Sequence, residues 1–408
     1  MNYDEVENWL CNDLPFFQNQ GRIAYKENLE NISDLLNKIG NPQNNFKCIH
    51  VAGTNGKGSV SYMLSKLLKE QNYRVGLFTS PHLLTFRERI QLNNEYIDKE
   101  SVIQFVKKFK SLSQFVNFSF FEFTTAMAFW FFNKKNVDIA IIECGLGGRL
   151  DSTNVIHPIL SIITSVSLDH ANILGNNLIS IANEKAGIIK KNIPVLISSQ
   201  NKNDVINVFS ERAKKLSSSI FYTKKIVNKY SNINLPSYQL FNIELVKSAK
   251  SILSQLGIKF SKNKSYKIIE SYYKKNFFIG RWTIIQKKPL IICDIAHNIQ
   301  GLKSVFSQLR KENKKKHIVL GFSSDKDLIE IFKIINLDAT YYFCSCSNPR
   351  VLNPKKYFSL IKSINKNFFL FNNPIDAVKE IIDKKSDDEM VFVTGSSFIV
   401  ADVLSIFR

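Results

Sequence analysis

The sequence has few of the features that mark secreted, membrane-spanning or disulfide-bonded proteins. Its six cysteines include no C-x-x-C pair, and Cys48, Cys144 and Cys293 lie within or at the ends of apolar runs, which indicates reduced, buried thiols. The N-terminal segment has no basic stretch followed by an apolar core, so no signal peptide is expected. The most apolar window, 115–132, is interrupted by polar residues and is shorter than the roughly 20 apolar residues of a membrane span. We therefore expect a cytoplasmic protein in which residues 115–132 form a buried core element.

Negative charge is scarce relative to positive charge. The chain has 35 acidic and 55 basic residues and a formal net charge of +20. Such a balance is compatible with binding nucleic acid, an anionic membrane surface or a small polyanion, and equally with lysines scattered over a solvated surface. The run Lys314–Lys316 is short and has no aromatic residues between the lysines, so we interpret it as a solvated helix end. No nucleic acid or membrane partner is expected.

Nearly continuous apolar runs, separated by helical patterns, recur along the 408 residues. Runs of this kind are typical of strands buried on both faces, and they predict a doubly wound, mainly parallel sheet followed by a second, smaller α/β domain. The boundary is expected near the end of a lysine-rich stretch, which gives domains of residues 1–284 and 285–408. The expected strands lie within 46–52, 74–80, 137–145, 158–168, 289–297, 317–322, 340–346, 366–371 and 389–395.

A glycine-rich turn, VAGTNGKGSV (51–60), follows the first of these runs and precedes a helical pattern over residues 60–68. The backbone amides of residues 53–59 would lie at a helix N-terminus, where unpaired donors favour a phosphate. Lys57 has the length to reach the β- and γ-phosphates of a nucleotide, and Ser59 carries a hydroxyl suited to Mg²⁺. The spacing of glycine and lysine differs from the usual P-loop, and a glycine turn without a ligand is the alternative.

Polar residues terminate three further apolar runs, where ligands of open α/β sheets gather. Glu143 is placed as a metal-directed acid beside the phosphate loop, although a structural ion pair with Arg149 is an alternative. Asp169 and His170 end a second run, and His170 is either a ligand or an ordinary hydrogen-bonded histidine. A third run ends in DIAHN (294–298), and the residue pattern alone does not decide what that segment contacts.

Taken together, the motifs resemble those of folylpolyglutamate synthase and the bacterial bifunctional dihydrofolate synthase, within the Mur ligase superfamily. They occur in order over nearly the whole chain, and the set is specific to the folate branch, whereas the glycine loop alone would indicate only the superfamily. The motifs are HVAGTNGKGSV (50–60), TSPHL (79–83), RERI (87–90), FEFTTAMAFWFF (121–132), ECGLGGRLDSTN (143–154), ITSVSLDH (163–170), NEKAGIIK (183–190), GRW (280–282), DIAHN (294–298) and DKD (325–327).

The resemblance implies an N-terminal P-loop domain with a folate site, residues 1–284, and a C-terminal Rossmann-like glutamate ligase domain, residues 285–408. It implies an ATP-dependent ligase in which a dihydropteroate or folate carboxylate attacks ATP to give an acyl phosphate, and L-glutamate then displaces phosphate. It also implies two Mg²⁺ sites, a carbamylated lysine at Lys185 and a monomeric enzyme. Carbamylation turns a cation into an anionic oxygen ligand, which suits a hard metal.

The same resemblance assigns roles to individual residues. The ATP phosphates would lie on Gly53, Thr54, Asn55, Gly56, Lys57, Gly58 and Ser59, one Mg²⁺ on Ser59 and Glu143, and a second on His170 and Lys185. Arg281 and His297 would contact the γ-phosphate or glutamate, Asp294 the ribose, and Asn242 the adenine. The substrates would lie against Ser80, His82, Phe121, Phe123, Arg149, Asp151 and Ser396, with core packing as the alternative for the two phenylalanines.

The segment 235–242, LPSYQLFN, departs from the family pattern at Ser237 and Tyr238, where glycine and histidine are more usual. Two other functions remain open at this point. One is a Mur-type ligase that acts on a peptidoglycan precursor or an amino-acid polymer. The other is a P-loop protein that binds nucleic acid through its positive charge, which would require an affinity that falls steeply with salt.

Overall fold

The computed structural model describes residues 1–16, 27–114, 116–224, 236–261, 279–364, 367–384 and 388–407. The chain divides into two compact units. The first comprises Met1–Ile233 and Gln239–Lys274, and the second comprises Asn234–Tyr238 and Lys275–Arg408. Residues 115, 235 and 366, and much of the lysine-rich stretch, belong to sequence predictions that lie outside the described residues.

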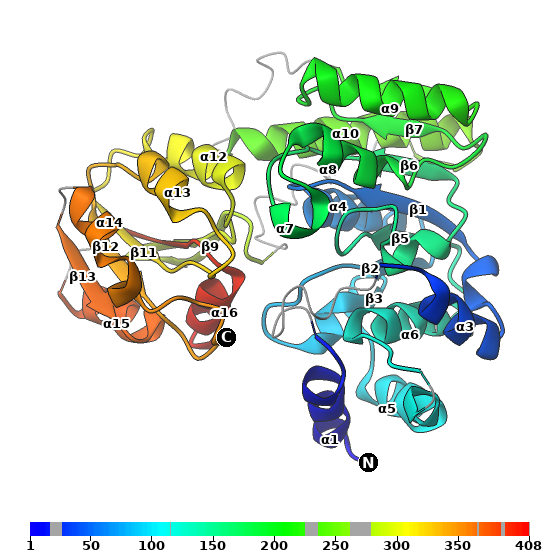
Figure 1. Ribbon diagram of the computed structural model, residues 1–408, viewed down its shortest axis with the longest axis horizontal. Coiled ribbons are helices and arrows are strands. Elements are labelled where there is room, and N and C mark those ends of the chain that lie inside the picture. The colour runs from blue at the N-terminus through cyan, green and yellow to red at the C-terminus, as the bar shows by residue number, and fades with distance from the viewer. Residues whose placement is uncertain are drawn as a thin grey trace. The chain divides into compact units, whose positions relative to one another are not determined.

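The described strands of the first unit form an eight-stranded sheet in the order β4-β3-β2-β5-β1-β6-β7-β8 (Figure 1). The pairs are parallel except β2 with β3 and β3 with β4, which confirms the prediction of a mainly parallel, doubly wound sheet. The strands are β1 Lys47–Ala52, β2 Val75–Phe78, β3 Ile90–Leu92, β4 Glu95–Tyr96, β5 Ile139–Glu143, β6 Leu160–Ile163, β7 Val195–Ile197 and β8 Ile220–Tyr222.

The helices of this unit cover the sheet and include several short turns. They are α1 Tyr3–Asn8, η1 Trp9–Asp13, α3 Glu30–Lys38, η3 Pro42–Asn44, α4 Lys57–Lys69, η4 Phe86–Arg89, α5 Lys99–Phe109, η5 Lys110–Gln114, α6 Phe120–Lys134, η6 Ser152–Val155, α7 Ala171–Leu174, α8 Leu178–Ala186, α9 Asn203–Lys215 and α10 Ser237–Gln255.

Helix α6 accounts for most of the apolar window 115–132 and confirms it as a core element. Ser119 caps the helix by accepting from the Glu122 amide, and Glu122 Oε2 accepts from the Ser119 amide in return, which satisfies two donors at the buried N-terminus. The phenylalanine-rich helix is apolar on almost all sides and packs with side chains of α1, α3, α5 and the sheet in one core. None of the helices in the described ranges is both long and apolar enough to cross a membrane.

The strand register brings three loops together at one edge of the sheet. Val51 lies opposite Glu143, and Ala52 lies opposite Ile163, so the glycine-rich loop leaves β1 between the ends of β5 and β6. The sequence predicted a strand over 158–168, but β6 ends at Ile163. The segment after Ile163 contacts the glycine-rich loop instead, so the strand pairing of β6 with β1 stops at Ile163.

The second unit contains a six-stranded sheet in the order β13-β12-β11-β14-β10-β9, with only β9 antiparallel to its neighbour. Its elements are β9 Thr283–Lys287, β10 Leu290–Cys293, α12 Ile299–Leu309, β11 Lys316–Leu320, α13 Leu328–Ile334, β12 Thr340–Cys344, η7 Pro354–Tyr357, α14 Phe358–Ser363, β13 Phe368–Phe371, α15 Pro374–Lys384, β14 Met390–Thr394 and α16 Ser397–Ser405. The predicted boundary between residues 284 and 285 falls inside β9. Because β9 pairs with β10 from Thr283 onward, the strand lies wholly in the second unit.

Candidate active site

The glycine-rich loop turns sharply between β1 and α4 and depends on two glycines. Gly53 has φ +149° and Gly56 has φ +94°, conformations that favour glycine. A Cβ on Gly53 would lie 1.8 Å from Thr164 Oγ1, and one on Gly56 would lie 2.4 Å from Asn242 Oδ1. The loop therefore packs tightly between the segment after β6 and helix α10, and Gly56 is the N-cap of α4, where backbone amides are available to an anion.

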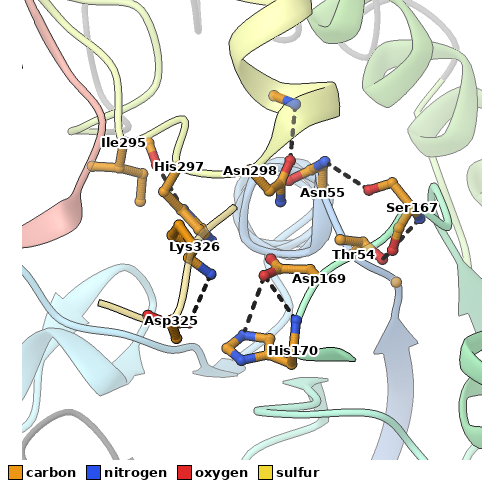
Figure 2. Close-up of polar contacts among 12 residues, drawn as sticks. Thr54, Asn55, Ser167, Asp169, His170, Ile295, His297, Asn298, Asp325 and Lys326 are labelled. Atoms are coloured by element: carbon orange, nitrogen blue, oxygen red, sulfur yellow. Dashed lines mark hydrogen bonds and ion pairs between the residues drawn. The ribbon is translucent and has the colours of Figure 1, made fainter. Parts of the chain in front are cut away.

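Residues after β6 clamp this loop, and the sequence had not identified them. Figure 2 shows the contacts of Ser167 with Thr54 and Asn55. Thr54 Oγ1 donates to Ser167 O at 3.1 Å and accepts from Ser167 N at 3.1 Å. The backbone carbonyl oxygen of Asn55 accepts from Thr164 Oγ1 at 2.8 Å and from Ser165 Oγ at 3.0 Å. The hydroxyl residues in ITSVS were a visible signal, but their partners lie more than 100 residues away in the chain.

Two lysines meet at the carbonyl of Gly53. Lys57 Nζ donates to Gly53 O at 3.1 Å and to Thr54 O at 3.3 Å, and Lys185 Nζ donates to Gly53 O at 3.0 Å. Lys185 is only 2% exposed. Burial, and then the charge of Lys57, lowers the pKa of Lys185 to about 7. Two amino groups that share one carbonyl favour a bound anion whenever both are protonated. Burial and the Lys57 charge also make the neutral form of Lys185 accessible near pH 7.

Ser59 and Glu143 carry the kinds of oxygen donor that a Mg²⁺ site beside the loop would need. The Ser59 hydroxyl oxygen is buried and has no hydrogen-bond partner among the described residues. Glu143 is 2% exposed at the end of β5, and its Oε2 accepts from the Ser80 amide at 3.1 Å. A hydroxyl and a carboxylate are the oxygen donors that Mg²⁺ combines with substrate phosphates, so the residues present fit the ion. No group of three His, Cys, Asp or Glu side chains suited to a metal occurs in the described ranges, and the predicted ligand set contains only two such residues.

Among the described contacts, Arg149 does not pair with Glu143, which was the alternative that the sequence left open for this carboxylate. Arg149 instead binds Glu184, with its Nη2 2.8 Å and its Nε 3.1 Å from Glu184 Oε1. His170, the N-cap of α7 with φ +51°, lies beside Asp169, and its Nε2 is 3.9 Å from Asp169 Oδ1 (Figure 2). Arg149 is therefore a partner of Glu184, and the structure does not support the alternative in which Glu143 is its structural partner.

Asp151 closes the loop after β5 on itself. Its Oδ2 accepts from the Leu146 amide at 2.7 Å, and its Oδ1 accepts from the Thr153 amide at 3.0 Å and from the Thr153 hydroxyl. The Thr153 hydroxyl lies 2.8 Å from His50 Nε2, and Cys144 Sγ lies 3.1 Å from the same nitrogen. Burial is the main cause that raises the pKa of Asp151. The structure thus gives Asp151 a role in shaping the loop, which the sequence did not indicate.

His50 is expected to make the protein less stable in acid. It is fully buried, and burial lowers its pKa from 6.5 to about 3. Because the unfolded state binds a proton that the folded state excludes, stability falls as pH decreases from 6.5 towards 3, by at most about 1.4 kcal/mol per pH unit. Urea denaturation near pH 6.5 and about one unit lower measures this slope. A His50→Gln variant, which keeps a donor towards Thr153, should have a shallower slope; equal slopes would contradict the prediction.

The predicted substrate-contacting phenylalanines separate into two environments. Phe123 is fully buried and packs edge-on against Trp9 and Phe105, with ring centroids at 5.3 and 5.1 Å. Phe123 is therefore core, and its assignment to the substrate site is corrected. Phe121 is partly exposed and lies over Gly145, where a Cβ would be 2.6 Å from its ring. His82 lies in the loop after β2, and its Nδ1 accepts from Arg89 Nε at 2.7 Å.

In the second unit, Asp294 is a buried acceptor at the end of β10. Its Oδ2 accepts from the Tyr238 hydroxyl at 2.5 Å and from the Trp282 amide at 2.9 Å, and its Oδ1 accepts from the Ala296 amide at 2.9 Å. Burial raises the pKa of Asp294, and the nearby Arg281 charge opposes that shift. A ribose contact would have to compete with these donors. Tyr238, which departs from the family pattern, shares Asp294 Oδ2 with the Trp282 amide.

The remaining predicted residues have defined local contacts. His297 Nδ1 lies 2.9 Å from Ile295 O, and Ser396 Oγ accepts from the Phe398 amide at 3.2 Å as the N-cap of α16 (Figure 2 shows the first contact). Asn242 of α10 is buried and donates to Gln239 at 3.1 Å. Ser396 thus has a capping role, whereas Asn242 lies against Gly56 of the glycine-rich loop.

The fold agrees with comparisons to known proteins. Family models for the Mur ligase middle domain and for the Mur ligase glutamate ligase domain match residues 51–268 and 280–397. The chain therefore belongs to the Mur ligase family of ATP-dependent ligases, and within it to the dihydrofolate synthase and folylpolyglutamate synthase group.

Relatives and solved structures cover almost the entire chain. The dihydrofolate synthase/folylpolyglutamate synthase of Bacillus subtilis is 30% identical and covers 98% of both chains. The folylpolyglutamate synthase of Thermotoga maritima has a crystal structure that is 31% identical, with a TM-score of 0.79 over 99% of this chain and 96% of its own. The Mycobacterium tuberculosis folylpolyglutamate synthase, solved in complex with ADP, is 25% identical with a TM-score of 0.84, over 99% and 98%. This similarity confirms the predicted fold class and family.

Proposed function

We propose that this ligase attaches L-glutamate to dihydropteroate, to reduced folates, or to both. The substrate carboxylate attacks the γ-phosphorus of ATP, which gives an acyl phosphate and ADP. The amino group of glutamate then attacks the acyl carbon, loses a proton and displaces phosphate, which leaves an amide. Both steps build negative charge on oxygen, so the reaction needs fixed cations and amide donors more than it needs a nucleophilic side chain.

The observation that carries this proposal is the convergence of Lys57 and Lys185 on Gly53 O beside a loop of backbone amides. Lys57 can turn from this carbonyl to an anion, and the loop amides at the start of α4 would hold phosphate oxygens. Lys185 would serve the site as a carbamate instead, in which the former cation is an oxygen ligand for a metal. We assign Lys57 to the β- and γ-phosphates and the loop residues Gly53 to Ser59 to the phosphate cradle. We assign Asn242, which lies against Gly56, to the base of the nucleotide.

We assign Ser59 and Glu143 to one Mg²⁺ and His170 with carbamylated Lys185 to a second. When bound, these ions neutralise charge on the phosphate oxygens. In the second unit we assign Arg281 and His297 to the phosphate or the incoming glutamate, and Ser396 to the glutamate side. Ser80, His82, Phe121 and Arg149 would contact the folate or pteroate, and Asp151 shapes the loop that holds it. Residues 1–284 would carry ATP and folate, and residues 285–408 the glutamate ligase function.

The proposal includes no partner beyond these small molecules, and no nucleic acid or membrane. We propose a monomer that works in the cytoplasm, where thiols stay reduced. All six cysteines are free, and burial raises the pKa of the Cys48 thiol to about 12. The strong positive charge has a use here, since folates and their glutamate tails are polyanions that a basic surface attracts.

Lys185 is expected to take up CO2 in a pH-dependent way. Only the neutral amine attacks CO2, and a pKa of about 7 makes the neutral fraction rise as pH increases through neutrality. Carbamylation also removes the repulsion between Lys185 and Lys57. With ¹³C-bicarbonate, we expect one carbamate ¹³C signal that grows as pH is raised through about 7. The signal should be absent in Lys185→Ala and retained in Lys191→Ala, an exposed neighbouring lysine. A signal that survives in Lys185→Ala would contradict the assignment.

Phosphate release from Mg·ATP tests the function directly. The purified protein is assayed with L-glutamate and either dihydropteroate, tetrahydrofolate or no acceptor. Release with dihydropteroate alone defines a dihydrofolate synthase, and release with both acceptors defines a bifunctional enzyme. Glutamate and an acceptor should both be required, and turnover in the absence of both would refute the proposal.

A further inference from the structure

The loop after β2, which contains His82, is held by several hydrogen bonds. Residue Thr79 at its start donates its amide to Arg89 O at 2.9 Å. The Glu88 carboxylate accepts from the amides of Leu83, Leu84 and Thr85 at 2.8, 2.9 and 3.0 Å. A carboxylate that satisfies three consecutive amides holds the loop in one conformation. His82 therefore lies in a loop whose backbone is held by hydrogen bonds to Glu88.

Arg89 is the buried cation of this loop. Its side chain is 3% exposed, and the guanidinium carbon lies 4.9 Å from the ring centroid of Phe120 and 5.7 Å from that of Phe16. Both distances are within the range of a cation–π contact, so the two rings help to hold the guanidinium in place. In this orientation Arg89 Nε donates to His82 Nδ1 at 2.7 Å. The His82 ring is itself packed against Phe16 at 6.2 Å and edge-on to Phe86 at 6.5 Å.

This contact decides where the His82 proton lies. Arginine is a donor only, so Nδ1 must be the acceptor and carry no proton, and the neutral ring then carries its proton on Nε2. Protonation of both nitrogens would place two N–H groups face to face. His82 Nε2 has no hydrogen-bond partner among the described residues, and the ring is partly exposed. The Nε2–H of His82 is thus a donor that no hydrogen bond among the described residues uses.

The loop is also tied to the phosphate site. The Ser80 amide donates to Glu143 Oε2 at 3.1 Å, and Glu143 lies opposite Val51 at the start of the glycine-rich loop. His82 is two residues from Ser80, so the histidine belongs to the loop that this hydrogen bond ties to the phosphate site. We infer that Arg89 is a positioning residue that holds His82 as the Nε2–H tautomer, so that His82 donates to a carbonyl oxygen or ring nitrogen of the pteroate or folate substrate.

This inference rests on the proposed function for the identity of the substrate, but the tautomer can be measured without turnover. The full-length protein is labelled with ¹⁵N-histidine, and long-range ¹H–¹⁵N spectra are recorded at neutral pH without ligand. The His82 signals are assigned by their loss in His82→Gln. We expect a single Nε2–H tautomer in the wild type and a mixture in Arg89→Lys, because the lysine ammonium lacks the rigid Nε donor. A wild-type Nδ1–H tautomer would overturn the inference.

Steady-state kinetics test the consequence for substrate binding. In Arg89→Lys we expect the KM for the folate or pteroate acceptor to rise about tenfold, which corresponds to ~1.4 kcal/mol, while kcat and the KM for ATP change less than about twofold. Arg87→Lys is the matched control. Arg87 lies in the same short helix but donates to Ile97 O at 3.3 Å instead, so neither the tautomer nor any KM should change. An unchanged tautomer and acceptor KM in Arg89→Lys would overturn the inference.

A second pair of variants keeps the test valid if Arg89→Lys does not fold. Glutamine places an N–H near the position of His82 Nε2, whereas asparagine does not reach it. We expect the acceptor KM to rise about tenfold in His82→Asn and less than about threefold in His82→Gln. Equal KM values in the two variants would refute the donor role. Absence of glutamate-dependent turnover in the wild type would overturn the proposed function, while the tautomer result would still decide the role of Arg89.

Discussion

Lys185→Ala should lower the rate of glutamate addition by about 10³-fold, the scale expected when one group that stabilises transition-state charge is removed. Lys185 Nζ is buried at the glycine-rich loop and shares the Gly53 carbonyl with Lys57. The variant removes both the amine and the anionic group that we propose it becomes. ADP binding, measured by calorimetry, should change much less, because the loop amides and Lys57 remain. Single-turnover phosphate release with a pteroate or folate acceptor measures the loss.

The matched control is Lys191→Ala, which removes an exposed lysine from the same part of the chain. It should leave turnover within about twofold of the wild type. Thermal unfolding separates a catalytic defect from misfolding. Since burial lowers the pKa of Lys185 to about 7, its protonated form is costly in the folded state below that pH. Lys185→Ala should therefore be no less stable than the wild type under mildly acidic conditions. Turnover within tenfold of the wild type would contradict the assigned role.

Gly53→Ala should abolish tight nucleotide binding. The new methyl group would lie 1.8 Å from Thr164 Oγ1, and the residue would be held at φ +149°, which is unfavourable for any side chain. The loop must then move away from the segment after β6, and its clamp by Thr164 and Ser165 is lost. We expect the affinity for ADP to fall about 100-fold and the protein to lose about 2 kcal/mol of stability.

Two further variants show whether the clash is the cause. Gly257→Ala also places alanine at a positive φ, +87°, but nothing lies within 4 Å of its Cβ, so it should cost only about 1 kcal/mol and leave ADP binding unchanged. Removing the threonine oxygen in Gly53→Ala/Thr164→Ala should restore part of the affinity, because the remaining Thr164 contacts are at 3.0 Å or more. An ADP affinity in Gly53→Ala equal to the wild type would show that the loop tolerates the displacement.

Local patterns in the sequence determined the elements and the location of the phosphate loop. Apolar runs were sufficient to place β1, β2, β5, β10, β11, β12 and β14, because strands buried on both faces need apolar residues at nearly every position. Short or edge strands such as β4 and β8 have no such requirement, and they were not predicted. The glycines of the loop were recognisable because a turn with positive φ restricts the residue type. Individual roles came from resemblance to a family rather than from these patterns.

Only the tertiary structure decided which of these residues meet. Lys185 reaches Gly53 O across 132 positions of sequence, and nothing local to Lys185 distinguishes it from a solvated helix face. Phe121 and Phe123 are two residues apart, yet one borders a loop and the other is core, because the rotation of α6 against the sheet assigns their faces. The contacts of Asp294 with Tyr238 and of Arg89 with His82 likewise depend on side-chain orientation and burial. Periodicity in one sequence carries information about neighbours along the chain, whereas hydrogen bonds and pKa shifts depend on neighbours in space.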